Sequence, residues 1–329
     1  MRSVAWQDRY GTHTALVAAE PWLADALARD LPNASTKPAD PSAEHQAIVA
    51  TRDQLEPVPN ATLRQARLAV LLDSTTPERL RATQAFAGRR AGRLVVVPTL
   101  DTLVAAEHTF LLLLATVRRL LPAYSELVAG SRRRDIASRP TDRGPSTPNW
   151  VGMAEPGWLW GRTLGILGLG RVGEAVAVRA VAFGMRVIYH DLVARQDVEL
   201  RYGAERRRFD QLLRESDIVT LHLPLTGDTN RIIDAPELAL MKPGAILVNT
   251  ADGRLIDEGA LIRALRLDAI DGAGLDVFAY EPLAADSPLL GFDNVVLTPH
   301  IAGVSTETSR DHLAAGAVAA LNAVADHEW

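Results

Sequence analysis

Cysteine is absent from this chain of 329 residues. The chain therefore has no disulfide framework, no thiol nucleophile and no thiolate metal site, and we expect no bound metal. The lack of cysteine also suits a cytoplasmic protein. Excess charge is small, −5 at pH 7, which gives no electrostatic reason to expect binding to nucleic acid or to an anionic membrane.

Long hydrophobic runs are missing as well. The longest covers residues 110–117, far short of the ~20 residues that span a bilayer. Asp8, Arg9 and Glu20 interrupt the N-terminal region, so it contains no signal-peptide core. The length exceeds the size at which one hydrophobic core usually stops growing, so we expect two domains. Since neither a spanning segment nor a signal peptide is recognised, we also expect the protein to be cytoplasmic.

The first part of the chain, residues 1–102, has the pattern of a small α/β unit. Short apolar runs typical of buried parallel strands cover residues 15–18, 47–50, 69–72 and 94–97. Helices are expected at residues 21–31 and 79–86, the second with Thr76 as its cap and Pro77 in its first turn. Residues 32–42 are rich in Pro, Asn and Ser and are expected to form a loop.

A strongly apolar helix is expected next, at residues 103–121, and its composition suits a domain or subunit interface. His108 on this helix is better explained as a hydrogen-bonded structural histidine than as a catalyst. Residues 130–149 form a polar, Arg-rich stretch that is expected to be a long loop. We interpret its Arg132–Arg134 run as solvated, with anion binding as the alternative.

From Arg162 onward, strand and helix patterns alternate. Strands are expected at residues 163–167, 187–189, 218–223, 245–249, 273–277 and 295–297. Helices are expected at residues 174–183, 209–214, 236–241 and 258–267, with a closing helix at residues 306–325. This alternation predicts a doubly wound parallel sheet with helices on both faces, in which a ligand lies beyond the carboxyl ends of the strands.

A dinucleotide-binding motif joins the first of these strands to its helix. Gly168, Gly170 and Gly173 supply the G-x-G-x-x-G pattern. Gly168 permits the tight turn, Gly170 lets the backbone approach a pyrophosphate, and Gly173 allows close packing of helix on strand. The free N–H groups at the helix start would then face the phosphates.

Asp191 ends the second strand, where it is placed to accept hydrogen bonds from an adenosine ribose. A carboxylate there repels a 2′-phosphate, which favours NAD over NADP. Arg195 lies close in the sequence and leaves NADP open as an alternative.

Polar side chains follow three later strands. Thr250 and Asp252 come after the strand ending at residue 249, Asp276 ends the next strand with Glu281 in its loop, and His300 follows the last. A histidine made more basic by a carboxylate can exchange a proton with an alcohol or ketone oxygen while a hydride moves to or from a nicotinamide. Asp276 is a candidate to hold the nicotinamide amide or ribose.

Several stretches together resemble the D-isomer-specific 2-hydroxyacid dehydrogenase family, over about residues 103–310. They read GRTLGILGLGRVG, DIVTLHLPLTGDTNRIID, MKPGAILVNTADG, GAGLDVFAYEPL and NVVLTPHIAG. The resemblance implies two Rossmann-like α/β domains, with a nucleotide domain at residues 103–297 inserted into a substrate domain built from residues 1–102 and 298–329. It also implies an NAD-dependent oxidoreductase that acts on a small hydroxy or oxo substrate, as a homodimer joined through the nucleotide domain.

The resemblance assigns roles to individual residues. His300 becomes the acid/base and Glu281 its carboxylate partner, while Asp252 stands at a third catalytic position. The cofactor-binding set that it implies is Gly168, Gly170, Arg171, Val172, Gly173, Asp191, Pro224, Thr229, Thr250, Asp276, His300 and Gly303.

Two departures concern the substrate carboxylate. The family motif after residue 249 carries an Arg that clamps this group, and Asp252 occupies that position here. An anion in place of the cation removes a bidentate clamp and repels a carboxylate. Arg254 is a possible substitute. The glycine-rich substrate loop of the family is also replaced, because residues 72–77 read LDSTTP.

Three hypotheses therefore remain open. The favoured one is a working NAD-dependent oxidoreductase with a changed substrate, in which Asp252 meets an amine, a hydroxyl or another donor. The alternatives are a non-catalytic NAD(H)-binding sensor or interaction protein, and a standard 2-hydroxyacid dehydrogenase in which Arg254 binds the carboxylate.

Overall fold

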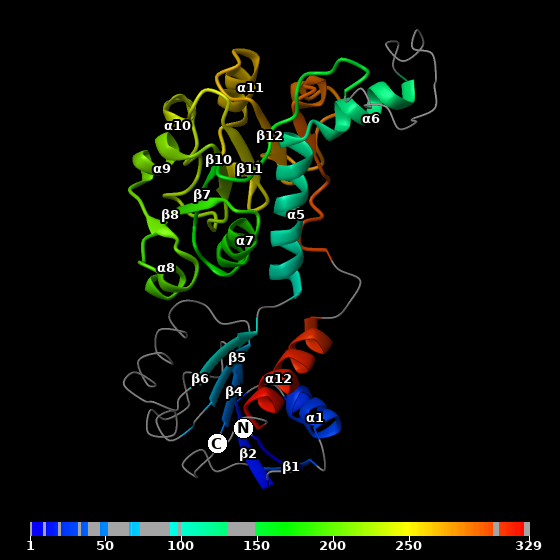
Figure 1. Ribbon diagram of the computed structural model, residues 1–329, viewed down its shortest axis with the longest axis vertical. Coiled ribbons are helices and arrows are strands. Elements are labelled where there is room, and N and C mark those ends of the chain that lie inside the picture. Colours follow the sequence, from blue (N-terminus) through cyan, green and yellow to red (C-terminus); the bar gives the residue numbers. More distant parts are fainter. Residues whose placement is uncertain are drawn as a thin grey trace, which may run out of the picture. The chain divides into compact units, whose positions relative to one another are not determined.

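The computed structural model describes residues 2–8, 11–18, 21–31, 34–38, 47–51, 66, 68–72, 93–97, 100–129, 149–304 and 309–325. The fold divides into two compact units, one made of residues 1–104 and 304–329 and the other of residues 105–303 (Figure 1). The first unit is thus built from both ends of the chain. The division places residues 298–303 in the second unit, whereas the sequence analysis joined them to the C-terminal helix.

The first unit contains a six-stranded sheet in the order β3-β1-β2-β4-β5-β6. Its strands are β1 (Arg2–Asp8), β2 (Gly11–Ala18), β3 (Ser35–Pro38), β4 (Ala47–Thr51), β5 (Leu68–Leu72) and β6 (Arg93–Val97). Strands β2, β4, β5 and β6 run parallel, as predicted. Helices α1 (Pro21–Asp30) and α12 (Ser309–Ala325) share a buried hydrophobic core with this sheet.

Two strands of this unit, β1 and β3, were not predicted from the sequence. Strand β1 pairs antiparallel with both β2 and β3, so the sheet is mixed. Strand β3 lies in residues 32–42, where the prediction of a loop was wrong. All four of its residues are exposed, so this edge strand shows no apolar pattern, and it is fixed by pairing with β1. The predicted helix at residues 79–86, the loop at residues 73–77 and the Arg-rich stretch at residues 130–148 lie outside the described residues.

The second unit contains a seven-stranded, wholly parallel sheet in the order β13-β12-β11-β10-β7-β8-β9. Its strands are β7 (Thr163–Leu167), β8 (Arg186–His190), β9 (Glu205–Arg206), β10 (Ile218–Leu221), β11 (Ile246–Asn249), β12 (Gly272–Leu275) and β13 (Val295–Leu297). Chain order reverses between β7 and β10, which makes the carboxyl ends of these two neighbours the switch point where ligands bind in such sheets. The predicted α/β fold class is confirmed.

Helices cover both faces of this sheet (Figure 1). One core contains α5 (Leu100–Val117) and α7 (Arg171–Ala182), and the other contains α9 (Phe209–Glu215), α10 (Ala235–Leu240) and α11 (Glu258–Arg266). Every residue of β7, β10, β11 and β12 is buried, so these strands read as continuous apolar runs. A short helix, α8 (Gln196–Tyr202), links β8 to β9.

The apolar stretch at residues 103–121 forms two helices and not the single helix predicted. Helix α5 ends at Val117, and α6 (Leu120–Ala129) begins after Arg119, whose φ of 50° does not fit a helix. Among the described helices, α5 alone is long and apolar enough to cross a membrane, and 56% of it is buried within the protein. Burial of this kind is typical of a core helix.

Candidate functional site at the strand ends of the second unit

The turn between β7 and α7 requires its glycines for packing reasons. Gly168 has a φ of +89°, and a Cβ there would lie 2.6 Å from the carbonyl oxygen of His222. A Cβ on Gly173 would lie 2.1 Å from the carbonyl oxygen of Gly168. Gly170 differs, because a Cβ there would meet nothing within 4 Å. The backbone at Gly170 therefore faces open space, as the approach of a pyrophosphate requires.

Helix α7 begins directly after this turn. Its N-cap residue is Gly170, and no side chain caps the helix. Arg171, Val172 and Gly173 form its first turn. Uncapped N–H groups and the positive end of the helix dipole create an anion site. The open approach, the uncapped helix and the nearby carboxylate of Asp191 all fit a dinucleotide.

Asp191 follows β8 and turns back toward the same turn. Its Oδ2 accepts a hydrogen bond from the Leu169 N–H at 2.7 Å, and its Oδ1 accepts one from the Val193 N–H at 3.1 Å. Arg195 is only 3% exposed and is held inside the protein. The sequence left open that Arg195 binds a 2′-phosphate, but the structure turns it inward, away from such a role.

The loop after β10 holds two further predicted cofactor residues close together. The hydroxyl of Thr229 donates to the carbonyl oxygen of Pro224 at 2.7 Å and accepts from the Thr226 N–H at 2.7 Å. Thr250, after β11, lies farther along the same sheet edge, and its hydroxyl is hydrogen-bonded to that of Thr109 on α5 at 2.9 Å. Gly303 is exposed at the end of the second unit. Their contacts to a cofactor stay predictions.

His222 is a residue of this region that the sequence analysis passed over. It follows β10 at the switch point, which was the signal available in the sequence. Burial lowers the pKa of its imidazole to about 3, so the ring is neutral at physiological pH. In the part of the chain that the structure describes, its buried Nε2 has no hydrogen-bond partner. The backbone of His222 adjoins Gly168, and its buried Nε2 is unsatisfied, so His222 is a further candidate to contact a ligand near the turn.

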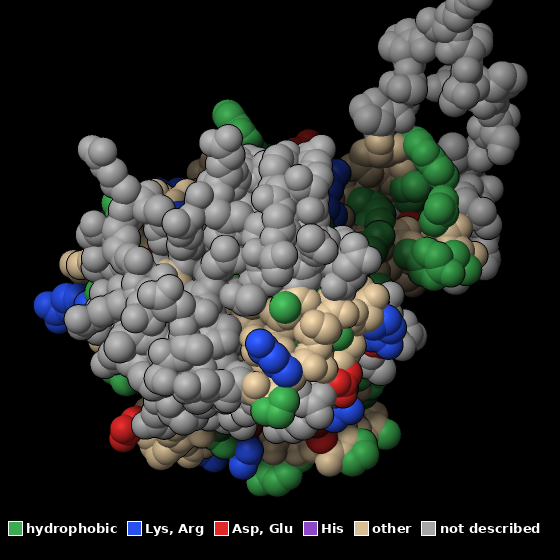
Figure 2. Space-filling view, turned by 90° about the horizontal axis from the view of Figure 1, so that it is seen from below, with side chains coloured by type: hydrophobic (Ala, Val, Ile, Leu, Met, Phe, Trp, Pro, Cys, Tyr) green, Lys and Arg blue, Asp and Glu red, His purple; other side chains and the backbone are tan. Residues whose placement is uncertain are grey.

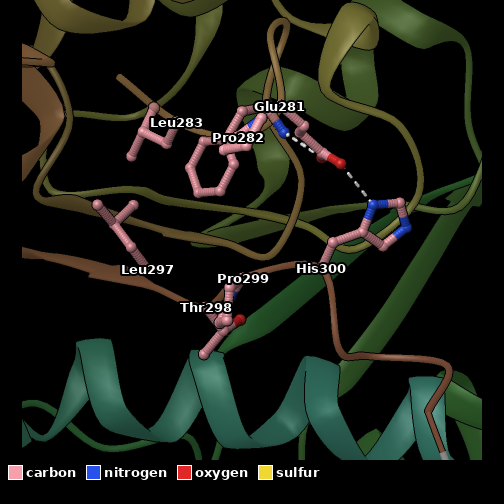
Figure 3. Close-up of a pocket in the computed structure, with 8 residues that line it drawn as sticks. Glu281, Pro282, Leu283, Leu297, Thr298, Pro299 and His300 are labelled. Carbon is pink, nitrogen blue, oxygen red and sulfur yellow. Dashed lines mark hydrogen bonds and ion pairs between the residues drawn. The ribbon is translucent and has the colours of Figure 1, made fainter. Parts of the chain in front are cut away.

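His300 follows β13 and Glu281 lies in the loop after β12, and the two side chains form a hydrogen-bonded pair. Nδ1 of His300 lies 2.7 Å from Oε2 of Glu281, and Nε2 is on the opposite side of the ring (Figure 3). Glu281 is held in turn, because its Oε1 accepts a hydrogen bond from the Phe278 N–H at 3.0 Å. A cavity of about 540 Å³ adjoins the pair and is lined by Phe278, Glu281, Pro282, Leu283, Leu297, Thr298, Pro299 and His300.

The electrostatics of this pair favour a protonated histidine. The hydrogen bond that His300 donates to Glu281 raises the pKa of His300, and the nearby charges of Asp276 and Asp252 act in the same direction. Burial of Glu281 opposes its ionisation, but the hydrogen bonds from His300 and from the Phe278 N–H outweigh burial and lower the pKa of its carboxyl. The imidazole is 62% exposed, so it is accessible for proton exchange.

Asp276 holds the segment that carries His300. Its side chain has no exposed surface, and its Oδ1 accepts from the Thr298 hydroxyl at 2.6 Å and from the Ile301 N–H at 2.9 Å. Its Oδ2 accepts from the Ala302 N–H at 2.8 Å, and its backbone oxygen accepts from the His300 N–H at 2.8 Å. These bonds fix His300 in its unusual backbone conformation, with a φ of 56°. The predicted contact of Asp276 with the nicotinamide stays a prediction.

His108 completes this buried network from helix α5. Its Nε2 lies 2.8 Å from the Thr298 hydroxyl and 3.4 Å from Oδ1 of Asp276. Since the Thr298 hydroxyl donates to Asp276, it accepts from the Nε2–H of His108. The predicted hydrogen bonding of His108 is confirmed, and its purely structural role stays a prediction.

Replacing Asp276 by Asn is expected to lower stability. An amide offers one acceptor oxygen where the carboxylate offers two, so at least one buried donor loses its partner, at a cost of about 1–3 kcal/mol in the free energy of unfolding. Urea unfolding measures the stability change. Asp271→Asn is the matched control, because Asp271 is 45% exposed and pairs with Arg119 at the surface. Equal stability of the two variants would contradict the proposed network.

Asp252, at the family's arginine position, is paired with Arg254. Its Oδ1 and Oδ2 accept from Nε and Nη2 of Arg254 at 3.1 and 3.0 Å, and Oδ1 also accepts from the Arg254 N–H at 2.9 Å. Hydrogen bonding by the Arg254 side chain is the main cause that lowers the pKa of Asp252, although burial opposes it. Arg254 itself is 59% exposed. A guanidinium is therefore present near this strand end, and it is bound to the carboxylate of Asp252.

No group of three or more His, Asp or Glu side chains suited to holding a metal occurs among the described residues.

Comparison with known proteins identifies the family. Residues 110–302 match the NAD-binding domain of the D-isomer-specific 2-hydroxyacid dehydrogenases. A glyoxylate reductase from Korarchaeum cryptofilum is 48% identical over 187 residues, which are 56% of this chain and 56% of that protein. One from Aeropyrum pernix is 45% identical over 212 residues, 64% of this chain and 60% of that protein. The chain thus aligns with less than two thirds of the length of these relatives.

A solved structure extends the likeness along the chain. The D-lactate dehydrogenase of Aquifex aeolicus, in complex with NAD and lactic acid, is 26% identical, with a TM-score of 0.54 over 95% of each chain. The family match covers the dinucleotide turn, Asp191, Asp276 and the His300–Glu281 pair, each of which has the geometry described above. This chain belongs to the D-isomer-specific 2-hydroxyacid dehydrogenase family and carries that family's NAD-binding domain.

Proposed function

We propose that this protein is an NAD-dependent oxidoreductase that interconverts a small hydroxy substrate and its oxo form. The His300–Glu281 hydrogen bond of 2.7 Å, at the strand edge that carries the dinucleotide turn, is the observation that supports an active enzyme. A carboxylate that raises the basicity of an exposed imidazole serves proton exchange with a substrate oxygen. The relatives are glyoxylate reductases, so glyoxylate is the first substrate to test.

In the proposed mechanism, His300 handles the proton. Nδ1 stays bonded to Glu281, and Nε2 donates a proton to the oxo group during reduction or accepts it from the hydroxyl during oxidation. Bound NAD(H) supplies or accepts the hydride. Glu281 fixes the ring orientation and stabilises the imidazolium, while Asp276 fixes the backbone that carries the ring. Asp191, the glycine turn and the start of α7 hold the dinucleotide.

The direction of the His300 pKa shift predicts the pH dependence. Reduction needs the imidazolium, so kcat/KM for reduction should be constant at low pH and fall as pH rises through the raised pKa of His300. Oxidation needs the neutral ring and should show the opposite profile. Glu281→Gln removes the main cause of the raised pKa, so the reductive profile should move to lower pH. Rate profiles of both proteins between pH 5 and pH 10 test this, and coincident profiles would contradict the role of Glu281.

The substrate side is expected to differ from that of the family. Asp252 stands where the family has an arginine. The neighbouring cation, Arg254, is bonded to both carboxylate oxygens of Asp252, so it is already paired with an anion. We propose that Asp252 either positions Arg254 for a substrate carboxylate or receives a substrate hydroxyl or amine. The same pairing is the observation in favour of a second candidate function, a non-catalytic NAD(H)-binding sensor on this fold.

Two measurements, of NADH oxidation and of NADH binding, separate these functions. Purified protein with NADH is offered glyoxylate, other 2-oxo acids, and aldehydes and ketones without a carboxylate, and NADH oxidation is followed by absorbance. An active enzyme oxidises NADH with at least one class. Tight NADH binding in calorimetry without turnover on any substrate supports the sensor, and absence of NADH binding overturns both proposals.

A homodimer is proposed as the assembly. Helix α6 and the segment before β7 expose large apolar side chains, namely Leu120, Leu121, Tyr124, Leu127, Val128, Trp150, Trp158 and Trp160, each at least 46% exposed. Figure 2 shows hydrophobic side chains gathered at the right of its view, the side on which α6 lies in Figure 1. Apolar patches of this kind mark protein interfaces, and a second copy of the chain is the partner that the family suggests.

Charge placed on this patch is expected to separate the dimer. Tyr124→Glu puts a carboxylate on a side chain that is 64% exposed, so the fold should tolerate it while an apolar interface should not. Light scattering during size-exclusion chromatography measures the mass. Leu200→Glu is the control for a change of surface charge, because Leu200 is 89% exposed and lies on α8, on the opposite side of the second unit from α6 (Figure 1). A monomeric wild-type protein would contradict the proposed homodimer. A dimeric Tyr124→Glu variant would show that this patch is not the dimer interface.

A further inference from the structure

We infer that Arg195 is a positioning residue for cofactor binding, because it clamps the dinucleotide turn from inside the protein. The inference rests on cofactor binding at this turn, as the proposed function requires. It concerns the residue that the sequence left as a candidate for a 2′-phosphate contact.

Leu169, the residue between Gly168 and Gly170, is held at both of its backbone groups. Its N–H donates to Oδ2 of Asp191 at 2.7 Å, and its carbonyl oxygen accepts from Nη1 of Arg195. Both partners come from the segment between β8 and α8, and both reach across to the turn. The peptide groups on either side of Leu169 are thus fixed at the place where the backbone must approach the pyrophosphate.

The guanidinium is built into the protein by further bonds. Nη2 of Arg195 donates to Oε2 of Glu174 at 2.8 Å, and Nε donates to Oδ1 of Asp197 at 3.1 Å. Glu174 lies in the first turn of α7 and Asp197 in the first turn of α8. Arg195 therefore connects the turn and the helix that follows it to α8. A side chain 3% exposed, with all three nitrogens engaged, cannot move to a ligand without breaking these bonds.

The backbone of Arg195 is anchored as well. Its N–H donates to the hydroxyl of the fully buried Tyr189 at 2.8 Å, and that hydroxyl donates to Glu199 at 2.6 Å. Tyr189 lies on β8 and Glu199 on α8, so these bonds fix the backbone position of Arg195 between the strand and the helix. A turn fixed before binding loses less conformational freedom when the dinucleotide arrives, which favours affinity. The same bonds keep the positive charge away from the ribose edge at Asp191, where NADP would need it.

The test compares Arg195→Met with Arg207→Met by calorimetric titration of NADH and NADPH and by thermal melting. Arg207 is a matched control because it bonds Glu205 and Glu215 in the same unit, is 22% exposed, and donates no bond to the turn. Loss of a charge-assisted bond predicts that Arg195→Met weakens NADH binding about tenfold. NADPH binding should weaken by the same factor, and kcat at saturating NADH should be unchanged. Arg207→Met should change only the melting temperature.

The other outcomes overturn the inference. Unchanged NADH affinity in Arg195→Met would show that the arginine only supports the scaffold. Loss of NADPH affinity alone would show that it binds the 2′-phosphate. If Arg195→Met does not fold, Arg195→Lys replaces it, because lysine keeps the charge but lacks the planar fork that reaches three partners. Weaker NADH binding by Arg195→Lys supports the clamp, and unchanged binding overturns it. A wild-type protein that binds neither cofactor would overturn the proposed function itself.

Discussion

His300→Asn is expected to lower kcat by roughly 10²–10⁴-fold, the usual contribution of a general acid or base. Asparagine is the preferred replacement because His300 has a φ of 56°, and Asn adopts this left-handed conformation more readily than other residues with a β-carbon. The substitution therefore removes the imidazole with little strain in the segment that Asp276 holds. Steady-state kinetics at saturating NADH measures the effect.

The melting temperature of His300→Asn is the control. It should stay close to the wild-type value, since among the described residues the exposed imidazole is hydrogen-bonded only to Glu281. His300→Ala should show the same loss of kcat with an added loss of stability, because alanine is strained at this φ. An unaffected rate in His300→Asn would remove the proposed acid/base role.

Asp252→Arg is expected to raise kcat/KM for 2-oxo acids by roughly 10–100-fold, from the strength of a charge-assisted bidentate bond to the substrate carboxylate. The substitution restores the family's cation and removes a repulsive anion from the position. Neutral ketones of similar size should gain much less. The ratio of the two kcat/KM values isolates the carboxylate contribution.

Two further variants locate the cation that serves the substrate. Asp252→Asn removes the repulsion without adding a charge and should give a smaller gain. Arg254→Gln tests whether the guanidinium bound to Asp252 already receives the carboxylate. Loss of 2-oxo acid activity in Arg254→Gln, with no gain in Asp252→Arg, would show that Arg254 is the clamp. The same result would contradict the proposal that the carboxylate of Asp252 hinders binding of a 2-oxo acid.

The dinucleotide site was predictable from the sequence because its requirements are local. A short strand, three glycines at fixed spacing and a helix specify the turn, and the structure shows the close contacts that exclude side chains at Gly168 and Gly173. The parallel sheet of the second unit followed from the alternation of apolar runs with helical patterns, whereas its strand order is known only from the structure. The position of His300 and Glu281 beyond neighbouring strand ends made both candidates, and the resemblance to the family assigned them to each other.

The exposed edge strand β3 was not predictable, since a strand without a buried face has no apolar period. The break between α5 and α6 was missed for a related reason. The apolar composition continues across it, and the turn is set by the conformation of Arg119 and its bond to Asp271.

The sequence by itself determined the α/β fold and the dinucleotide turn, because each depends on residue types at short and regular spacing. Tertiary structure alone decided what three charged residues do. It turned Arg195 inward to clamp Leu169, paired Asp252 with Arg254, and placed Asp276 under the segment of His300. The physical reason is distance along the chain: His108 and Thr298 are 190 residues apart and share one hydrogen bond, and no local pattern records such a contact.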